Sequence, residues 1–166
     1  VPLDAPGKSE LLVNVEKLFT ADPENKNGEA VHDYSMRYFF GNAIAARKND
    51  LTAKKKIVFR GRALNDAPCQ LQIALVQKDG SAYGAVITVG LSADEYILDL
   101  QKLQPVKLVT LPRPYPSFLP YFFKPSGTQP FSITTCETLQ ISIGPGIPAD
   151  QLSGKHGIAI ESIRLE

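Results

Sequence analysis

Residues 56–64 read K-I-V-F-R-G-R-A-L and residues 70–77 read Q-L-Q-I-A-L-V-Q, and these two stretches decide the fold. Apolar and other residues alternate in both, which is typical of β-strands that bury one face and expose the other. The alternation predicts these inward residues: Ile57, Phe59, Gly61, Ala63, Leu71, Ile73 and Leu75. It predicts these outward residues: Val58, Arg60, Arg62, Gln70 and Gln72.

The turn Lys78-Asp79-Gly80-Ser81 follows the second stretch and predicts a β-hairpin with residues 82–89, because Asp-Gly favours tight hairpin turns. Further strands are predicted at 8–20, 30–40, 95–100, 137–143 and 157–165. A turn-rich loop is expected at 21–29 and a helical turn within 41–53. With about eight strands and no long amphipathic helix, the sequence predicts an all-β antiparallel sandwich.

The stretch at 108–123, L-V-T-L-P-R-P-Y-P-S-F-L-P-Y-F-F, alternates prolines with aromatic residues. Proline fixes φ and lacks a backbone donor, so this segment can form neither a helix nor the middle of a sheet. We expect an extended, stiffened crossover between strands, with rings that pack onto another part of the protein.

The composition is that of a globular domain and argues against several other classes of protein. The chain has 166 residues, 43 % hydrophobic and 21 % charged, with a net charge of +1. These values are typical of one globular domain and argue against nucleic acid as a partner, and no apolar run is long enough for a membrane helix. The opening V-P-L-D-A-P-G indicates a piece of a longer protein, so residues 1–9 are interpreted as a linker and residues 10–166 as the domain.

Two kinds of structural cross-link were considered. Cys69 and Cys136 either form one disulfide or are two unrelated buried thiols, and the sequence does not decide between them. A structural Ca²⁺ is a further possibility, because sandwich domains often join their first and last strands through a hard cation bound by oxygen ligands. The candidate carboxylates are Glu10, Glu16, Asp22 and Glu161.

Catalytic signatures are missing from the sequence. It contains no nucleophile elbow, zinc-protease or phosphate-binding motif, and His32 and His156 lack the spacing of a metal pair. Glycoside hydrolysis needs two carboxyl groups about 5 to 10 Å apart. Nothing in the sequence brings two of its acids together, so we predict a domain that is not an enzyme.

The aromatic and polar residues instead favour carbohydrate binding. Sugar rings stack on aromatic side chains, and their hydroxyls bond to planar polar groups. Outward arginines can also bind a carboxylate or sulfate on an anionic glycan, and Lys54, Lys55 and Lys56 add positive charge. The candidate carbohydrate-binding residues are Tyr34, Arg37, Tyr38, Arg60, Arg62, Gln72, Tyr83 and Tyr115. The outward residues Arg37, Arg60, Arg62, Gln70, Gln72 and Gln140 are expected to share one sheet face.

Several segments together resemble a known family: L-P-R-P-Y-P-S-F-L-P-Y-F-F at 111–123, E-T-L-Q-I-S-I-G-P-G-I at 137–147, I-E-S-I-R-L-E at 160–166, I-V-F-R-G-R-A-L at 57–64 and D-G-S-A-Y-G at 79–84. Over residues 10–166 the chain is similar to the jelly-roll β-sandwich domains, galactose-binding-like or carbohydrate-binding modules, attached to secreted polysaccharide-degrading enzymes of Bacteroidetes-type bacteria. The resemblance implies a non-catalytic module that binds a polysaccharide or oligosaccharide beside a linked catalytic domain, in a secreted, cell-surface or periplasmic bacterial protein.

Two alternatives remain open from the sequence. A structural jelly roll would pack against a glycosidase catalytic domain without binding glycan, and the proline-aromatic stretch would then be an inter-domain contact. A small β-sandwich hydrolase or lyase would need two carboxylates in a cleft. The sandwich fold serves all of these functions, so it does not choose among them.

Overall fold

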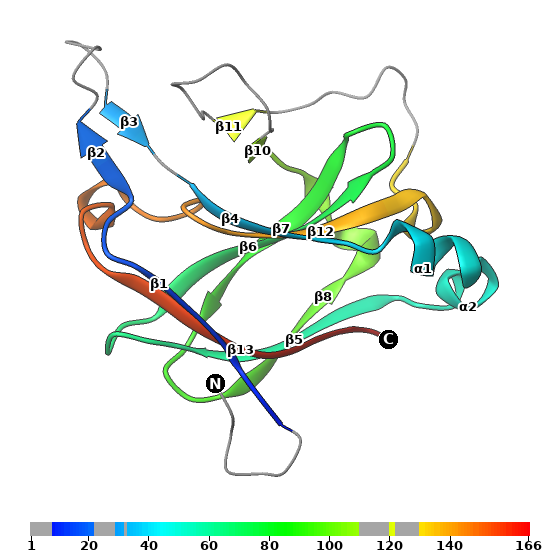
Figure 1. The fold of residues 1–166 in the computed structure, drawn as a ribbon, viewed down its shortest axis with the longest axis horizontal. Coiled ribbons are helices and arrows are strands. Elements are labelled where there is room, and N and C mark those ends of the chain that lie inside the picture. Colours follow the sequence, from blue (N-terminus) through cyan, green and yellow to red (C-terminus); the bar gives the residue numbers. More distant parts are fainter. Residues whose placement is uncertain (1–7, 22–28, 32, 110–119, 122–129) are drawn as a thin grey trace.

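Two antiparallel sheets pack face to face in the computed structural model of this protein (Figure 1), which describes residues 8–21, 29–31, 33–109, 120–121 and 130–166. The four-stranded sheet has the order β1 (Leu11–Val15), β13 (His156–Leu165), β5 (Lys56–Ala63) and β8 (Asp94–Asp99). The five-stranded sheet has the order β4 (Tyr34–Phe39), β12 (Cys136–Ile143), β6 (Cys69–Gln77), β7 (Ala82–Val89) and β9 (Gln104–Pro105).

This arrangement confirms the predicted all-β antiparallel sandwich of jelly-roll type. Sequence neighbours often lie in different sheets, and the first strand, β1, pairs with the last, β13. The predicted strand at 8–20 is divided into β1 and β2 (Phe19–Ala21), and that at 30–40 into β3 (Glu29–Val31) and β4. The two short strands β2 and β3 pair only with each other among the described residues.

The predicted hairpin joins β6 to β7, and its turn has local causes. Asp79 Oδ1 accepts hydrogen bonds from Ser81 N at 3.0 Å and from Ser81 Oγ at 2.6 Å. Gly80 has a φ of 87°, in the left-handed region that glycine adopts without a steric cost. These contacts set the register in which Leu75 lies opposite Tyr83, and so place the aromatic ring of Tyr83 at one end of the sandwich.

The core lies between the two sheets and includes the residues of β5 and β6 that the alternation placed inward. Phe59, Leu71, Ile73 and Ile158 are fully buried there. Gly61 belongs to the same face of β5, where a Cβ atom would overlap the backbone oxygen of Ala159. A larger residue cannot occupy this position without moving β13.

One outward prediction on β5 and one on β6 need correction. Val58 points away from the core but is only 1 % exposed, because it lies in an inner strand between Arg164 and Ile97 of the neighbouring strands. Gln72 also points outward, yet it is 4 % exposed. Its Nε2 donates to Lys107 O at 3.2 Å, since the chain after β9 crosses the outer face of β6.

The chain at this crossing enters the proline-aromatic stretch. Val106 N donates to Ala82 O at 3.0 Å, and the Val106 side chain packs near Ala74 and Ala82 on the outer face of the five-stranded sheet. Strand β10 (Leu108–Val109) then pairs with β11 (Pro120–Tyr121), and Figure 1 draws both beyond that sheet. Residues 110–119 and 122–129 lie outside the described residues, so the packing predicted for their rings stays a prediction.

The two cysteines are buried and unbonded. Cys69 begins β6, whereas Cys136 pairs with Gln77 at the other end of that strand, so the length of β6 separates them. Burial raises the pKa of Cys69 to about 11 and that of Cys136 to about 12. Of the two readings, the structure supports two separate buried thiols, both protonated at neutral pH.

Short helices close one end of the sandwich. The helical turn predicted within 41–53 is confirmed as α1 (Gly41–Ala46) and α2 (Lys48–Thr52), which lie beside each other in Figure 1. The 3₁₀ turns are η1 (Leu100–Lys102), η2 (Ile133–Thr135) and η3 (Ala149–Gln151). Among the described residues, no helix is long and apolar enough to cross a membrane.

Candidate functional site

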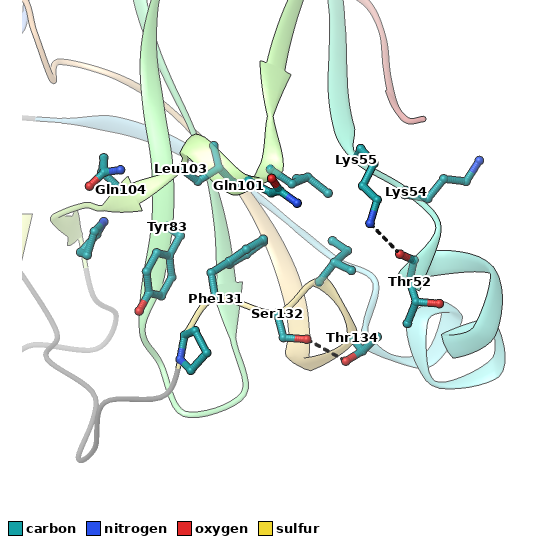
Figure 2. Close-up of a pocket in the computed structure, with 14 residues that line it drawn as sticks. Thr52, Lys54, Lys55, Tyr83, Gln101, Leu103, Gln104, Phe131, Ser132 and Thr134 are labelled. Carbon is teal, nitrogen blue, oxygen red and sulfur yellow. Dashed lines mark hydrogen bonds between the residues drawn. The ribbon is translucent and has the colours of Figure 1, made fainter.

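A pocket of about 580 Å³ opens at the end of the sandwich where α2, η1, η2 and the start of β7 meet (Figure 2). We call it the end pocket. Four separate parts of the chain line it. Its polar and aromatic lining residues are Thr52, Lys54, Lys55, Tyr83, Gln101, Gln104, Phe131, Ser132 and Thr134, and the remainder are Leu100, Leu103, Pro105, Pro130 and Ile133.

One wall of the end pocket is aromatic. The rings of Tyr83 and Phe131 lie with centroids 5.4 Å apart and planes inclined at 51°. Both rings are partly buried and pack against the core, and Leu103 is buried beside them. This tilted pair presents apolar ring surface next to solvent, as a stacking platform requires.

A buried glutamine holds this wall in place. Gln77, which is 5 % exposed, accepts a hydrogen bond from Ser132 N at 3.2 Å and another from Thr135 Oγ1. Its Nε2 donates to Ser81 Oγ at 2.9 Å. Gln77 therefore joins η2 to the β6–β7 turn, and so fixes Phe131 relative to Tyr83.

Polar groups form the rest of the end pocket. Ser132 Oγ and Thr134 Oγ1 are 2.9 Å apart, and Lys55 Nζ donates to Thr52 O at 3.4 Å. The backbone of η1 is capped by Asp99, whose Oδ1 accepts from Gln101 N at 2.9 Å. Gln104, like Gln101, brings a primary amide that both donates and accepts. The end pocket thus offers hydroxyl, amide and ammonium groups in addition to the two rings.

The charged side chains among the described lining of the end pocket are all positive. Lys54 and Lys55 line it, and its fourteen lining residues include no aspartate or glutamate. Within the described part of the chain, neither lysine forms an ion pair. In Figure 2, Lys55 reaches toward Thr52, whereas Lys54 turns away from the aromatic wall.

A second polar region covers the outer face of the five-stranded sheet. Gln140, which is 1 % exposed, accepts from Arg37 Nε at 2.7 Å and donates to Ser35 Oγ and Ser142 Oγ, each at 3.2 Å. The two serine hydroxyls are 2.7 Å apart. These four residues occupy neighbouring positions on β4 and β12. Their hydrogen bonds are made within the protein, so the network cross-links two strands.

The structure divides the predicted binding residues among several surfaces. Tyr83 lies in the end pocket. Arg37 and Gln72 lie on the outer face of the five-stranded sheet, with Gln70 and Gln140 on the same face. Tyr115 lies outside the described residues.

The expectation that Arg60 and Arg62 share one face with Arg37 and these glutamines is wrong. Arg60 and Arg62 belong to β5, in the opposite sheet. Arg60 Nε lies 2.8 Å from Glu161 Oε2, and Arg62 Nη2 lies 2.9 Å from Glu10 Oε1. Alternation shows which side of a strand a residue occupies, but it does not show to which sheet the strand belongs.

Tyr34 and Tyr38 lie on the other side of β4 from Arg37. They share that side with Met36, which packs on the core, but they are 48 % and 68 % exposed because β4 is an edge strand. Tyr38 lines a second, apolar pocket of about 400 Å³, together with Leu139 and Ile163. This pocket is separate from the Arg37 network.

Three of the four candidate calcium ligands, Glu10, Glu16 and Glu161, are described, and they do not form a cation site. Glu10 and Glu161 face arginines, and Glu16 Oε2 lies 3.0 Å from Lys155 Nζ. The described residues contain no group of three or more His, Cys, Asp or Glu side chains that could hold a metal ion, and Asp22 is not among them. The three described carboxylates therefore do not fit the metal.

Phe131, Gln101 and Gln104 were missed by sequence reasoning. Each comes from a short connecting segment with no motif of its own, and the contact between Tyr83 and Phe131 joins residues far apart in the chain. The local signal was the polar, turn-rich character of these connections. Loops that a rigid scaffold positions commonly carry binding residues.

Comparison with solved structures supports the fold. The family 11 carbohydrate-binding module from Clostridium thermocellum, in complex with a β-1,3-1,4-mixed-linked tetrasaccharide, is similar with a TM-score of 0.52 and 10 % identity, over 96 % of this chain and 84 % of that chain. The family 11 module of a cellulosomal cellulase of the same organism matches with a TM-score of 0.52 and 10 % identity, over 96 % and 83 %.

An exo-β-agarase also matches, with a TM-score of 0.52 and 11 % identity, over 98 % of this chain and 24 % of that chain. No protein-family model and no curated protein matches the sequence. The chain therefore shares a β-sandwich fold with these proteins.

Proposed function

We propose that this protein is a non-catalytic carbohydrate-binding domain that holds an oligosaccharide in the end pocket. The observation that carries the proposal is the tilted pair Tyr83–Phe131 beside Gln101, Gln104 and the Ser132–Thr134 hydroxyl pair. A sugar ring offers an apolar face to such rings and hydroxyls to such polar groups. The pocket volume of about 580 Å³ lies within the range common for small-molecule sites.

The end pocket is favoured over the outer face of the five-stranded sheet because its polar groups are accessible. Gln72, Gln140 and Ser142 are almost fully buried and hydrogen-bonded to other groups of the protein. A sugar could reach them only by breaking these contacts, and a buried polar group left without its partner costs about 1 to 3 kcal/mol.

The proposal extends to how the domain acts. The described residues that line the end pocket include no carboxylate, so they do not supply the acid pair of a glycosidase. Binding would instead raise the local concentration of a polysaccharide near a linked catalytic domain through the tether between them. We propose that residues 10–166 form the binding domain of such an enzyme, exported from a bacterial cell, and that residues 1–9 belong to the linker.

Affinity gel electrophoresis tests the proposal. The chain is run through gels that contain mixed-linkage β-1,3-1,4-glucan, agarose or a polyuronate, and retardation by at least one polymer is expected, with a dissociation constant on the order of micromolar to millimolar. Tyr83→Ala removes half of the aromatic wall and is expected to abolish the retardation. Tyr38→Ala is the matched control, because Tyr38 is an exposed tyrosine outside the end pocket.

The outcomes separate glycan binding from the structural role that the sequence also left open. If Tyr38→Ala abolishes retardation and Tyr83→Ala does not, the binding site lies at the edge strand β4 and the end pocket is excluded. If no polymer retards a sample whose folding is verified by its thermal melt, glycan binding is contradicted. The domain would then act structurally, by packing against a catalytic domain.

A further inference from the structure

We propose that the end pocket selects a sugar with a negatively charged substituent, a carboxylate or a sulfate, and that Lys55 is the residue that recognises this charge. This inference rests on the proposed function, because it names the class of sugar that the same pocket would take. Both charged residues among the described lining of the pocket are lysines. Arg60 and Arg62, in contrast, each lie beside a carboxylate.

The Lys55 ammonium group makes little contact with the described residues of the protein. Its one described contact is the hydrogen bond to Thr52 O at 3.4 Å, the long limit for such a bond. An ammonium group has three N–H donors, so the contact leaves donors for a ligand oxygen. The Lys55 side chain is exposed, and Figure 2 shows it reaching down between the segments that carry Gln101 and Thr52.

Asp99 pairs with Lys56 in the sheet and Glu166 accepts from Lys55 N, and the carboxylates of both residues have other partners. Asp99 accepts from Gln101 N and does not line the pocket. The Glu166 side chain accepts from Arg164 Nε at 2.6 Å, while its backbone oxygen accepts from Lys55 N at the same distance. The positive charge of Lys55 is therefore not cancelled by a side-chain ion pair, and Lys54 at the rim adds to it.

The aromatic rings and the Lys55 ammonium group line different sides of the end pocket. The rings of Tyr83 and Phe131 lie on one side of the end pocket, and Lys55 lies with Thr52 on the other. A ligand that fills both sides needs an apolar ring face and an anionic group on one small molecule. Uronic acids and sulfated sugars combine these features, whereas a neutral hexose would leave the ammonium group without an ionic partner.

Isothermal titration calorimetry tests the charge preference. The chain is titrated with three oligosaccharides of equal length: a neutral galactan, its sulfated form and an oligogalacturonate. We expect the anionic sugars to bind at least about threefold more tightly than the neutral one at low salt, because one accessible ion pair contributes up to about fivefold. The preference should shrink when the NaCl concentration is raised from roughly 0.02 to 0.2 M, because salt screens exposed charges.

Lys55→Gln removes the charge but keeps much of the side-chain stem. It is expected to weaken binding of the preferred anionic sugar by about three- to fivefold, because the accessible ion pair is lost, and to leave the neutral sugar unchanged. Lys55→Arg should restore most of the preference. Lys102→Gln is the matched control, since Lys102 is an exposed lysine of η1 that does not line the end pocket.

The possible results distinguish this inference from the proposed function. If all three sugars bind equally and Tyr83→Ala abolishes their binding, the end pocket is a glycan site but the charge preference is contradicted. A loss in Lys102→Gln equal to that in Lys55→Gln would assign the preference to net charge, which also overturns the inference. Binding of sulfated sugar without oligogalacturonate, or the reverse, would support it and identify the anion. No binding of any sugar would contradict the proposed function itself.

Discussion

Two cationic regions of this protein use their charges differently. On the outer face of the four-stranded sheet, Arg60, Arg62 and Arg164 each lie within 3 Å of a carboxylate of the same protein. In the end pocket, Lys54 and Lys55 have no such partner among the described residues. In the sequence, Arg60 and Arg62 were expected to point outward, and Lys54 and Lys55 were expected to add positive charge near them.

Whether a cationic side chain is already paired with a carboxylate affects how readily it can bind an anionic ligand. An arginine already bonded to a carboxylate must give up that pair before it binds a ligand, whereas the Lys55 ammonium can accept an anion without this loss. The four-stranded face is therefore interpreted as framework, and the end pocket as the binding surface. The predictions below test this division, from the largest expected effect to the smallest.

The largest effect is expected beneath the paired arginines, at Phe59. This side chain is 0 % exposed and packs in the core on the inner side of β5. Phe59→Ala should lower the free energy of unfolding by about 3 to 5 kcal/mol, because it removes buried contacts and leaves a cavity. Urea denaturation measures the loss. A loss below 1 kcal/mol would mean that β5 is not part of the framework.

The next largest effect is expected at Asp33, whose pKa is raised by burial. Asp33 packs against Gly144, whose φ is 145°, and burial raises the pKa of Asp33 from 3.8 to about 6. The folded protein therefore holds this proton more tightly than the unfolded chain. As a result, the contribution of Asp33 favours folding most below its unfolded-state pKa and declines as the pH rises toward 6.

Chemical denaturation at several pH values checks this effect. Relative to Asp33→Asn, the parent protein should lose at most about 2 to 3 kcal/mol of stability between roughly pH 4 and pH 7, at 1.36 kcal/mol per pKa unit and less where solvent screens this partly exposed group. Parallel pH profiles for parent and variant would show that Asp33 titrates normally.

A smaller effect should separate the two ion pairs of β5. Glu10 is 6 % exposed in its side chain, whereas Glu161 is 20 % exposed. Arg62→Met removes the cation beside the more buried carboxylate and should cost about 1 to 3 kcal/mol, because burial makes the loss of a partner expensive. Arg60→Met should cost less than about 1 kcal/mol, as exposed pairs usually do. Equal losses in urea denaturation would contradict the distinction.

The smallest effect on stability is expected at the end pocket. Lys54→Gln with Lys55→Gln should change the free energy of unfolding by no more than about 0.5 kcal/mol, because neither lysine takes part in an ion pair and substitutions at such positions are usually mild. The same urea experiment measures it. A loss as large as that in Arg62→Met would show that the lysines support the fold, and would remove the contrast between the two regions.

Much of the fold could be predicted because its signals are local. Alternation along β5 and β6 reflects which side of each strand is buried, and the Asp79-Gly80 turn specifies a hairpin through contacts within a few residues. The fully buried Phe59, Leu71 and Ile73 were all expected inward. The exceptions, Val58 and Gln72, are covered by side chains or backbone from other strands, which alternation along one strand does not contain.

The candidate site could be predicted only in part, for the same physical reason. The chemistry of Tyr83 as a stacking residue was readable from the sequence, and Lys55 was noted as part of a positive run. Their meeting with Phe131 and Gln101 depends on how the β6–β7 turn, η1 and η2 converge through long-range contacts such as those of Gln77. Short-range patterning thus determined the strands, while packing between distant segments decided the sheet partners, the paired arginines and the end pocket.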